Sequence, residues 1–499
     1  MVFHVTVDDC SHSPLTNARR CSQVCRFWRK ISLESPTIWA NSIDLTSLGQ
    51  EGDEWRNEVL RRIQNSALTV MGRCLEPEKL GLCKFFVRLL SDHWERIHDL
   101  DITFDADRMT NAEELIQALI RPAPNLRAFS LKPVSLLGTN EITFPLETQL
   151  FNGVAPSLVD FFVADDTILF GRGQQQLLTT LSASPLRHLA LTSFAKFTTA
   201  EIIATLSHLP LLESFIVNMW IGPQDIPPPS RVRVSLPKLK LMMVRSVNMA
   251  VYSDFLSHIY AHPGCVLTTH TKHIAGSELG AEIAEGLHHV LKRFSNNFLA
   301  SNINTMRTVT KMTLTFADHL FRLVCDNDPS EDLDTRQKFE FLIHRGILTS
   351  GLPLEACADA LSSLRYPESI KILDLDSPLS RSGLSSVTVG TLLAKFDLAL
   401  DSITELSATP QGLMRALARQ PQGTIPFPKL TTVIVRQWDL EKGAFLRIKE
   451  FLLDRQHVAP VKTLHLITAP YGVLSDLQLF DEFAGLCILW RDMRFCVTT

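Results

Sequence analysis

The chain has 499 residues, of which 45% are hydrophobic and 20% charged, and its formal net charge at pH 7 is −4. This apolar fraction is normal for a folded protein and too high for a mostly disordered one. A net charge so close to zero gives no overall field that would attract nucleic acid or an anionic membrane. No uninterrupted apolar run approaches the roughly 18–20 residues of a membrane-spanning helix. We therefore expect a soluble protein that binds neither nucleic acid nor membrane.

The N-terminal sequence and the cysteines indicate the cellular compartment. Residues 1–14 lack the basic segment followed by an apolar segment that marks a secretory signal peptide. The 10 cysteines are scattered along the chain, as is typical of reduced and mostly buried thiols. Both observations predict a cytoplasmic or nuclear protein.

The first segment with a clear periodicity is 17–33. Its apolar side chains Val24, Phe27, Trp28 and Ile31 follow the spacing i, i+3, i+4, i+7. This spacing predicts one helix that carries all four on a single stripe. Basic side chains occupy the opposite face, which favours a solvent-exposed face over a phosphate-binding one.

A helix boundary follows at Ser35 and Pro36. Serine can cap a helix and proline suits its first turn, so this pair predicts the end of one helix and the start of the next. Trp39 then supplies another large apolar group. A helical unit this small cannot be stable alone and must pack against the rest of the chain or a partner.

A short pattern recurs through the rest of the chain. It consists of an apolar residue, two free positions, an apolar residue, one free position and a third apolar residue. Between residues 97 and 239, and again between 370 and 461, successive copies begin 26–33 residues apart. The clearest copies begin at Leu126, Leu158, Leu186, Leu212, Leu239, Ile370, Leu430 and Val461, and weaker ones begin at Ile97, Val309 and Ile403.

Each copy has the period-two alternation of a strand of about three to five residues, and a helical pattern follows it. After the copy at Leu186, Thr198 and Glu201 form a capping-box motif, and Ile202, Ile203 and Leu206 form an apolar face. One strand and one helix per ~28 residues predict an α/β solenoid with a curved, mostly parallel sheet, whose units bury their apolar faces by stacking.

These patterns divide the chain into six segments. The spacing of the repeats blurs after Pro263, so the segment that follows is assigned to irregular repeats. The predicted segments are an N-terminal tail at 1–16, a helical unit at 17–48, a helical connector or cap at 49–93, the first part of the solenoid at 94–262, irregular repeats at 263–366, and the last part of the solenoid with a C-terminal cap at 367–499.

The sequence contains none of the common catalytic motifs. It has no Gly-x-Ser-x-Gly, no phosphate loop and no His-Glu-x-x-His. Cys10, His12, Cys21 and Cys25 are residue types that bind zinc, but their spacing matches no standard zinc finger, and Cys21 and Cys25 fall on a predicted helix where buried thiols are ordinary. We therefore expect no metal, no cofactor and no enzymatic activity.

The strand alternation also predicts a binding surface. Residues between the apolar positions of each strand lie on the opposite face of the sheet. Their mixture of acidic, basic, polar and apolar groups suits a protein target better than a small molecule. The candidates for target binding are Asp99, Asp101, His188, Met243, Arg245, Asp374, Asp376, Arg436 and His465.

Residues 24–39, VCRFWRKISLESPTIW, resemble the second half of an F-box. The repeats behind them resemble the leucine-rich-repeat-like regions of F-box proteins, especially those of large fungal families. The resemblance implies a substrate-recognition subunit of a Skp–cullin–F-box ubiquitin ligase, which binds a Skp-type adaptor, and through it a cullin, while its repeats hold a target protein. According to the resemblance, seven residues form the core of the box and its adaptor-facing surface: Val24, Cys25, Phe27, Trp28, Ile31, Pro36 and Trp39.

A full F-box begins with a Leu-Pro-x-Glu segment and an apolar first helix, and residues 1–14 contain neither. Two explanations stay open: the sequence is truncated at its start, or the box is degenerate and docks poorly. In the second case the chain would be a repeat scaffold that joins proteins without docking on the ligase. A third, distant alternative is an enzyme whose site lies in 263–366.

Overall fold

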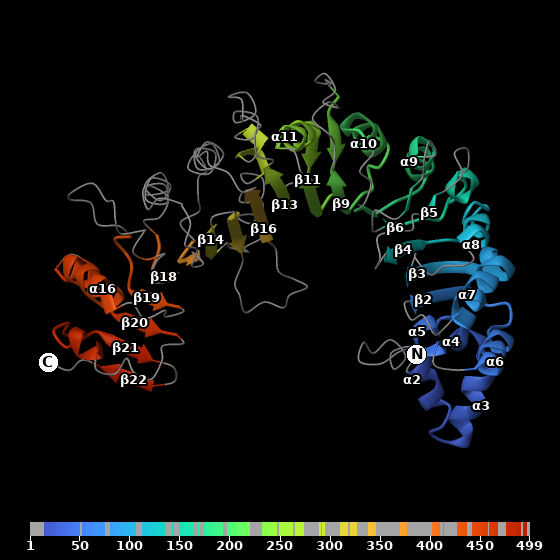
Figure 1. Cartoon of the computed structure of the whole chain (residues 1–499), viewed down its shortest axis with the longest axis horizontal. Coiled ribbons are helices and arrows are strands. Elements are labelled where there is room, and N and C mark those ends of the chain that lie inside the picture. Colours follow the sequence, from blue (N-terminus) through green and yellow to red (C-terminus); the bar gives the residue numbers. More distant parts are fainter. Residues whose placement is uncertain are drawn as a thin grey trace. The chain divides into compact units, whose positions relative to one another are not determined.

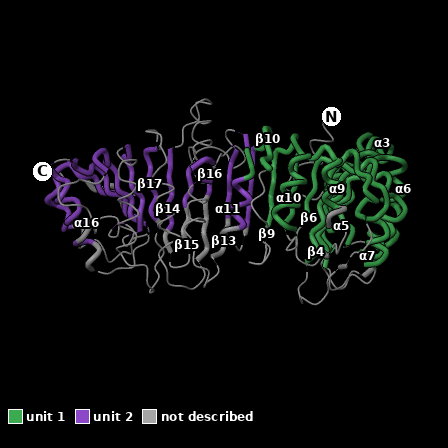
Figure 2. The backbone as a smooth tube through the Cα atoms, turned by 90° about the horizontal axis from the view of Figure 1, so that it is seen from above, with its two compact units in different colours: residues 1–239, 258–260 green, residues 240–257, 261–499 purple. Residues whose placement is uncertain are grey.

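The protein forms two compact units, residues 1–239 with 258–260 and residues 240–257 with 261–499, which Figure 2 colours separately. The computed structural model describes residues 14–49, 52–74, 80–105, 112–134, 142–143, 149–163, 168–169, 174–192, 197–219, 232–246, 249–262, 265–273, 289–290, 292–294, 310–317, 320–326, 338–345, 370–376, 402–409, 413, 427–436, 442–457, 459–467, 476–490 and 493–496.

Unit 1 begins with short helices. They are α2 (Pro14–Cys21), α3 (Arg26–Glu34), α4 (Pro36–Ala40), α5 (Leu45–Leu48) and α6 (Asp53–Ile63), with strand β1 (Ile43–Asp44) between α4 and α5.

The prediction of a single helix over 17–33 is wrong, because the chain breaks between α2 and α3. The Ser22 hydroxyl donates to the Arg19 carbonyl at 2.6 Å, a local bond that competes with helix continuation. Cys25 is extended, with φ −156°, and its sulfur accepts a hydrogen bond from the Trp28 amide at 3.5 Å. Cys25 therefore caps the start of α3, as serine or threonine often does. The predicted boundary at Ser35 and Pro36 is confirmed by the start of α4 at Pro36.

The rest of unit 1 is built on a parallel sheet. Strand β1 pairs with β2, and β2, β3, β4, β6, β8 and β9 each pair in parallel with the next. Figure 1 shows helices α7 to α10 along one face of this sheet. The strands are β2 (Leu68–Cys74), β3 (Ile97–Asp105), β4 (Ala128–Val134), β6 (Asp160–Val163), β8 (His188–Leu191) and β9 (Ser214–Met219).

The helices of unit 1 are α7 (Leu80–His93), α8 (Ala112–Leu119), α9 (Gln174–Ser182) and α10 (Thr199–Leu206), with 3-10 turns η1 (Trp94–Arg96) and η3 (Leu150–Gly153). The short strands β5 (Ile142–Thr143) and β7 (Ile168–Leu169) pair with each other. Further along the chain lie β10 (Val234–Leu236), α11 (Met249–His258) and β12 (Ile259–Ala261).

The capping box predicted at α10 is confirmed. The Glu201 amide donates to the Thr198 hydroxyl at 3.2 Å, and the Thr198 amide donates to the Glu201 carboxylate at 2.9 Å. The predicted apolar face is buried as well, with Ile202, Ile203 and Leu206 each at most 3% exposed. The helix therefore starts where two of its otherwise unpaired backbone donors are satisfied.

The segment 49–93, predicted as a helical connector or cap, holds the helices α6 and α7 and also the strand β2 between them. The register against β3 shifts after Leu68, and Gly72 has a positive φ of 120°. The repeat pattern requires an apolar residue two positions after Val70, and Gly72 occupies that position. The pattern therefore does not detect this strand.

Unit 2 also contains a large, mostly parallel sheet. Its strands pair in the order β11, β13, β16, β15, β14, β17, β18, β19, β20, β21, β22. The pairs β16–β15, β15–β14 and β21–β22 are antiparallel and the others parallel. Three strands of the segment assigned to irregular repeats, β14, β15 and β16, therefore form a meander within the sheet.

The strands of unit 2 are β11 (Leu241–Ser246), β13 (Val266–His273), β14 (Lys311–Ala317), β15 (Leu320–Asp326), β16 (Lys338–Arg345), β17 (Ile372–Asp376), β18 (Glu405–Ala408), β19 (Thr432–Val435), β20 (Thr463–Leu466), β21 (Cys487–Trp490) and β22 (Met493–Cys496). Helix α16 (Lys442–Arg455) and the 3-10 turn η7 (Asp476–Phe480) follow β19 and β20.

The recurring sequence pattern places the strands accurately. In all eight clear copies the strand begins two residues after the first apolar residue, which is itself buried. The buried rows run straight across each sheet, because the strands are in register. One row in unit 1 is Val70, Leu100, Phe129, Phe161, Leu189 and Phe215, and one in unit 2 is Met312, Leu373, Leu406, Val433, Leu464 and Ile488.

Burial of these rows stabilises the fold by about 25 cal/mol per Å² of apolar surface removed from water. The prediction of an α/β chain with large, mostly parallel sheets is confirmed.

Candidate protein-interaction surfaces

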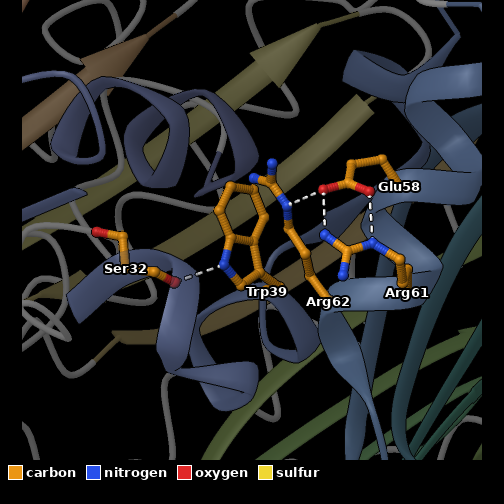
Figure 3. Close-up of polar contacts among 5 residues, drawn as sticks. All are labelled: Ser32, Trp39, Glu58, Arg61 and Arg62. Atoms are coloured by element: carbon orange, nitrogen blue, oxygen red, sulfur yellow. Dashed lines mark hydrogen bonds and ion pairs between the residues drawn. The ribbon is translucent and has the colours of Figure 1, made fainter. Parts of the chain in front are cut away.

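The helical unit is organised around Trp39, which is completely buried. Its indole Nε1 donates a hydrogen bond to the Ser32 carbonyl at 2.7 Å (Figure 3). This bond satisfies the polar atom of the buried ring and ties α4 to the last turn of α3. Of the seven residues assigned to the box and its adaptor-facing surface, Trp39 is the one that lies in the core.

A second group of side chains, from α6, covers the Trp39 ring. The Trp55 ring meets Trp39 edge to face with 6.2 Å between centroids. The Arg62 guanidinium lies 4.4 Å from the centre of Trp39 and 5.3 Å from that of Trp55. Both distances allow a cation–π interaction. The box segment 17–48 and the first helix of the connector segment 49–93 therefore share one core.

Glu58 holds this arrangement in place. Its carboxylate accepts hydrogen bonds from Arg61 Nε at 2.7 Å and from Arg62 Nε at 2.8 Å (Figure 3). These bonds lower the pKa of Glu58 from its ordinary value of 4.5 to about 2. Sequence reasoning missed Trp55, Glu58 and Arg62, although the i, i+4 spacing of Glu58 and Arg62 is a signal for a helix-surface ion pair.

Of the four residues predicted to form one apolar stripe, Phe27, Trp28 and Ile31 lie on α3, whereas Val24 lies between α2 and α3. Val24 is 65% exposed and Phe27 is 69% exposed. Trp28 and Ile31 are half-buried, as is Pro36 of α4. Cys25 is exposed, against the expectation of a buried thiol, whereas Cys21 is buried. An aromatic ring exposed beside other apolar side chains is typical of an interaction site.

In unit 1 the face of the sheet opposite the buried row carries Asp99, Asp101 and His188. Asp99 accepts a hydrogen bond from the Thr69 hydroxyl at 3.1 Å. His188 Nε2 lies 3.7 Å from Asp160 Oδ1, and both side chains are about half exposed. These three candidates therefore lie on strands of the same sheet, on the face opposite the buried row, as the alternation predicts.

A lateral row crosses the middle of this face. The Asp101 carboxylate accepts from Lys132 Nζ at 2.8 Å, and this ammonium lies 5.2 Å from the centre of the Phe162 ring. Lys132 and Phe162 were not among the predicted candidates. The register aligns Met71, Asp101, Ser130, Phe162, Ala190 and Ile216 in this row. The face thus combines charged groups with an apolar strip.

In unit 2 the fold brings together two candidates that are 62 positions apart in the sequence. Arg436 forms an ion pair with the Asp374 carboxylate, and Lys311 Nζ lies 3.1 Å from its other oxygen. The Asp374 side chain is only 6% exposed, so these two cations compensate its burial. Sequence reasoning missed Lys311, because its partner lies on a neighbouring strand far along the chain.

The other candidates of unit 2 are more dispersed. Met243 is half-buried and Arg245 exposed, both on β11. His465 is half-buried on β20, in register with Ile434 of β19. Asp376 ends β17, but its side chain lies outside the described residues.

Neither comparison with known proteins assigns the chain to a family: no family model matches it, and no curated protein does. Within the described ranges, no group of three or more His, Cys, Asp or Glu side chains is placed to hold a metal ion. Among the described helices, none has the length and apolar character that crossing a bilayer requires. Cys10 and His12 lie outside the described residues.

Proposed function

We propose that this chain is a non-enzymatic substrate-recognition subunit of a Skp–cullin–F-box ubiquitin ligase. In this proposal the helical unit docks on a Skp-type adaptor through α3, and the repeats hold the target protein. The observation that carries the proposal is the exposure of Phe27 and Val24 in a helical unit whose Trp39 is fully buried.

The packing of the helical unit supports a docking role for α3. The fully buried Trp39 packs against Trp55 and Arg62, and neither of these contacts involves Phe27. A phenylalanine that is 69% exposed leaves apolar surface in water, and covering it with a partner would be favourable by about 25 cal/mol per Å². Phe27 lies within the segment 24–39 that resembles the F-box pattern.

The repeats support a role in holding a protein target. We propose that the strand–helix modules stack as a leucine-rich-repeat-like solenoid, whose sheet face meets the target. In unit 1 this face places Asp101 and Lys132 beside Phe162, a mixture typical of protein interfaces. The chain would supply proximity and orientation, while partner subunits carry out ubiquitin transfer.

The experiment is a binding measurement between the full chain and a purified Skp-type adaptor. Phe27→Ser is expected to weaken binding tenfold or more and Val24→Ser by less, because a few large side chains carry most of the binding energy and valine is under-represented among them. The matched control is Leu446→Ser, since Leu446 is 51% exposed on α16, far from the box in the sequence. This control is expected to bind normally.

Failure to bind the adaptor, both in the chain as given and after a Leu-Pro-x-Glu segment is added upstream, would overturn the ligase role and favour the repeat scaffold without ligase docking. An equal loss of binding in Phe27→Ser and Leu446→Ser would show that the contact does not involve α3. Either result would contradict the proposal.

A further inference from the structure

Three rows of side chains cross the face of the unit 1 sheet that lies opposite the buried row. The middle row is the one that contains Asp101, Phe162 and Ile216. On the other side of it from the acidic row defined next, the register aligns Arg73, Thr103 and Lys132. The acidic row lies toward the N-terminal ends of the strands and consists of Thr69, Asp99, Ala128, Asp160, His188 and Ser214.

The two carboxylates of the acidic row are not ion-paired with any lysine or arginine of the described ranges. Asp99 accepts a hydrogen bond from the Thr69 hydroxyl at 3.1 Å. Asp160 Oδ1 lies 3.7 Å from His188 Nε2, and the Asp160 side chain is 42% exposed. Ala128, a small residue, lies between Asp99 and Asp160, one strand from each. Since neighbouring strands are about 4.8 Å apart, a long cationic side chain over Ala128 can reach both carboxylates.

The middle row supplies an apolar contact beside this position. Phe162 follows Asp160 by two positions on β6, so the ring and the carboxylate lie on the same face. Phe162 and Ile216 are both half-buried and leave apolar surface in water. The face already holds one cation in this way, because Lys132 Nζ lies 2.8 Å from Asp101 Oδ1 and 5.2 Å from the centre of the Phe162 ring.

We propose that this face binds a segment of the target protein in which a lysine or arginine stands close to a large apolar side chain. The cation lies over Ala128, and the apolar side chain covers Phe162 and Ile216. An acidic segment at the same place would bring like charges against Asp99 and Asp160 and lose affinity. This inference rests on the role proposed above for the repeats and adds the class of target that they select.

The test selects binders from a displayed library of random peptides 12 residues long, with the full chain as bait. Enriched peptides are expected to carry a lysine or arginine within three positions of an aromatic or large aliphatic residue. The Kd of the tightest peptide is then measured by calorimetry. The double variant Asp99→Asn/Asp160→Asn should weaken binding about tenfold or more, because it removes both charge-assisted contacts.

The matched control is the double variant Glu113→Gln/Glu114→Gln, which removes the same number of negative charges from α8, one of the helices on the other face of the sheet (Figure 1). It should bind the peptide with wild-type affinity. Replacing the basic residue of the peptide with glutamine should also weaken binding to the wild-type chain about tenfold. That measurement does not depend on the folding of any variant.

The inference is overturned if no peptide is enriched, if the enriched peptides lack basic residues, or if the two double variants bind equally well. The selection uses no adaptor, so its failure is distinct from failure of the ligase role. Adaptor binding without a basic preference would contradict this inference alone. A basic preference without adaptor binding would contradict the ligase role alone.

Discussion

The Arg62 guanidinium lies 4.4 Å from the centre of the Trp39 ring, so a cation of α6 covers the buried aromatic residue of α4. The same guanidinium is held by Glu58, which also binds Arg61. The predicted segments 17–48 and 49–93 are thus connected through the Trp39 ring and the ion pairs of Glu58 with Arg61 and Arg62. This arrangement leads to the first two predictions.

Trp39→Ala should destabilise unit 1 by about 3–5 kcal/mol, because it opens a cavity at a fully buried site. Trp39→Phe keeps an apolar ring but leaves the Ser32 carbonyl without its donor, at a cost nearer 1–2 kcal/mol. Chemical denaturation measures both changes. Trp28→Ala, at a half-buried position, should cost less than Trp39→Ala, and a larger loss would contradict this view of the core.

Glu58 should make the free energy of unfolding depend on pH in the acidic range. Its pKa is about 2 in the folded chain and near 4.5 when unfolded, so the unfolded chain binds the proton first. The stabilisation from its ionised form is present above about pH 4.5 and is lost as the pH falls toward 2.

Glu58→Gln should lower the melting temperature at neutral pH and reduce the change in melting temperature between pH 4.5 and 2. The matched variant Glu54→Gln, at an exposed glutamate of the same helix, should keep the wild-type profile. Identical pH profiles for Glu58→Gln and wild type would refute the role given to the arginine pair.

Gly72→Ala should be strongly destabilising. Gly72 has φ 120°, and a β-carbon there would lie 2.7–2.9 Å from Asp44 Oδ1 and from the amides of Leu45 and Thr46. Backbone strain alone costs about 1–3 kcal/mol, and the clash with α5 adds to it.

Gly485→Ala separates these two effects, because Gly485 also has a positive φ, 81°, but has open space around it. It should show the strain alone, and denaturation midpoints measure the difference. A cost for Gly72→Ala no greater than that for Gly485→Ala would rule out the contact with α5.

Asp374 and Arg436 should be energetically coupled. Asp374→Asn and Arg436→Met should each destabilise unit 2 by about 1–3 kcal/mol, because Asp374→Asn removes the anion that both cations contact, and Arg436→Met removes one of the two cations that compensate the buried carboxylate. The double variant should cost less than the sum of the two, by about 1 kcal/mol or more. Strict additivity in this double-mutant cycle would show that the pair contributes nothing.

Much of the local structure was predictable because its causes lie close together in the sequence. The alternation of Phe129 and Leu131 marks a strand, and Thr198 with Glu201 marks the start of a helix. The shared face of Asp99 and Asp101 follows from the same alternation. The prediction of one helix over 17–33 was wrong because the break between α2 and α3 depends on hydrogen bonds between the side chains of Ser22 and Cys25 and the backbone. Residue periodicity does not detect such bonds.

The sequence by itself therefore determined where most strands begin and which side chains alternate, since neighbours within a few residues decide these properties. Only the tertiary structure decided that Asp374 meets Arg436 and Lys311, and that Arg62 covers Trp39. Contacts between residues so far apart in the sequence depend on strand register and helix packing. Both are set by the simultaneous burial of many apolar side chains.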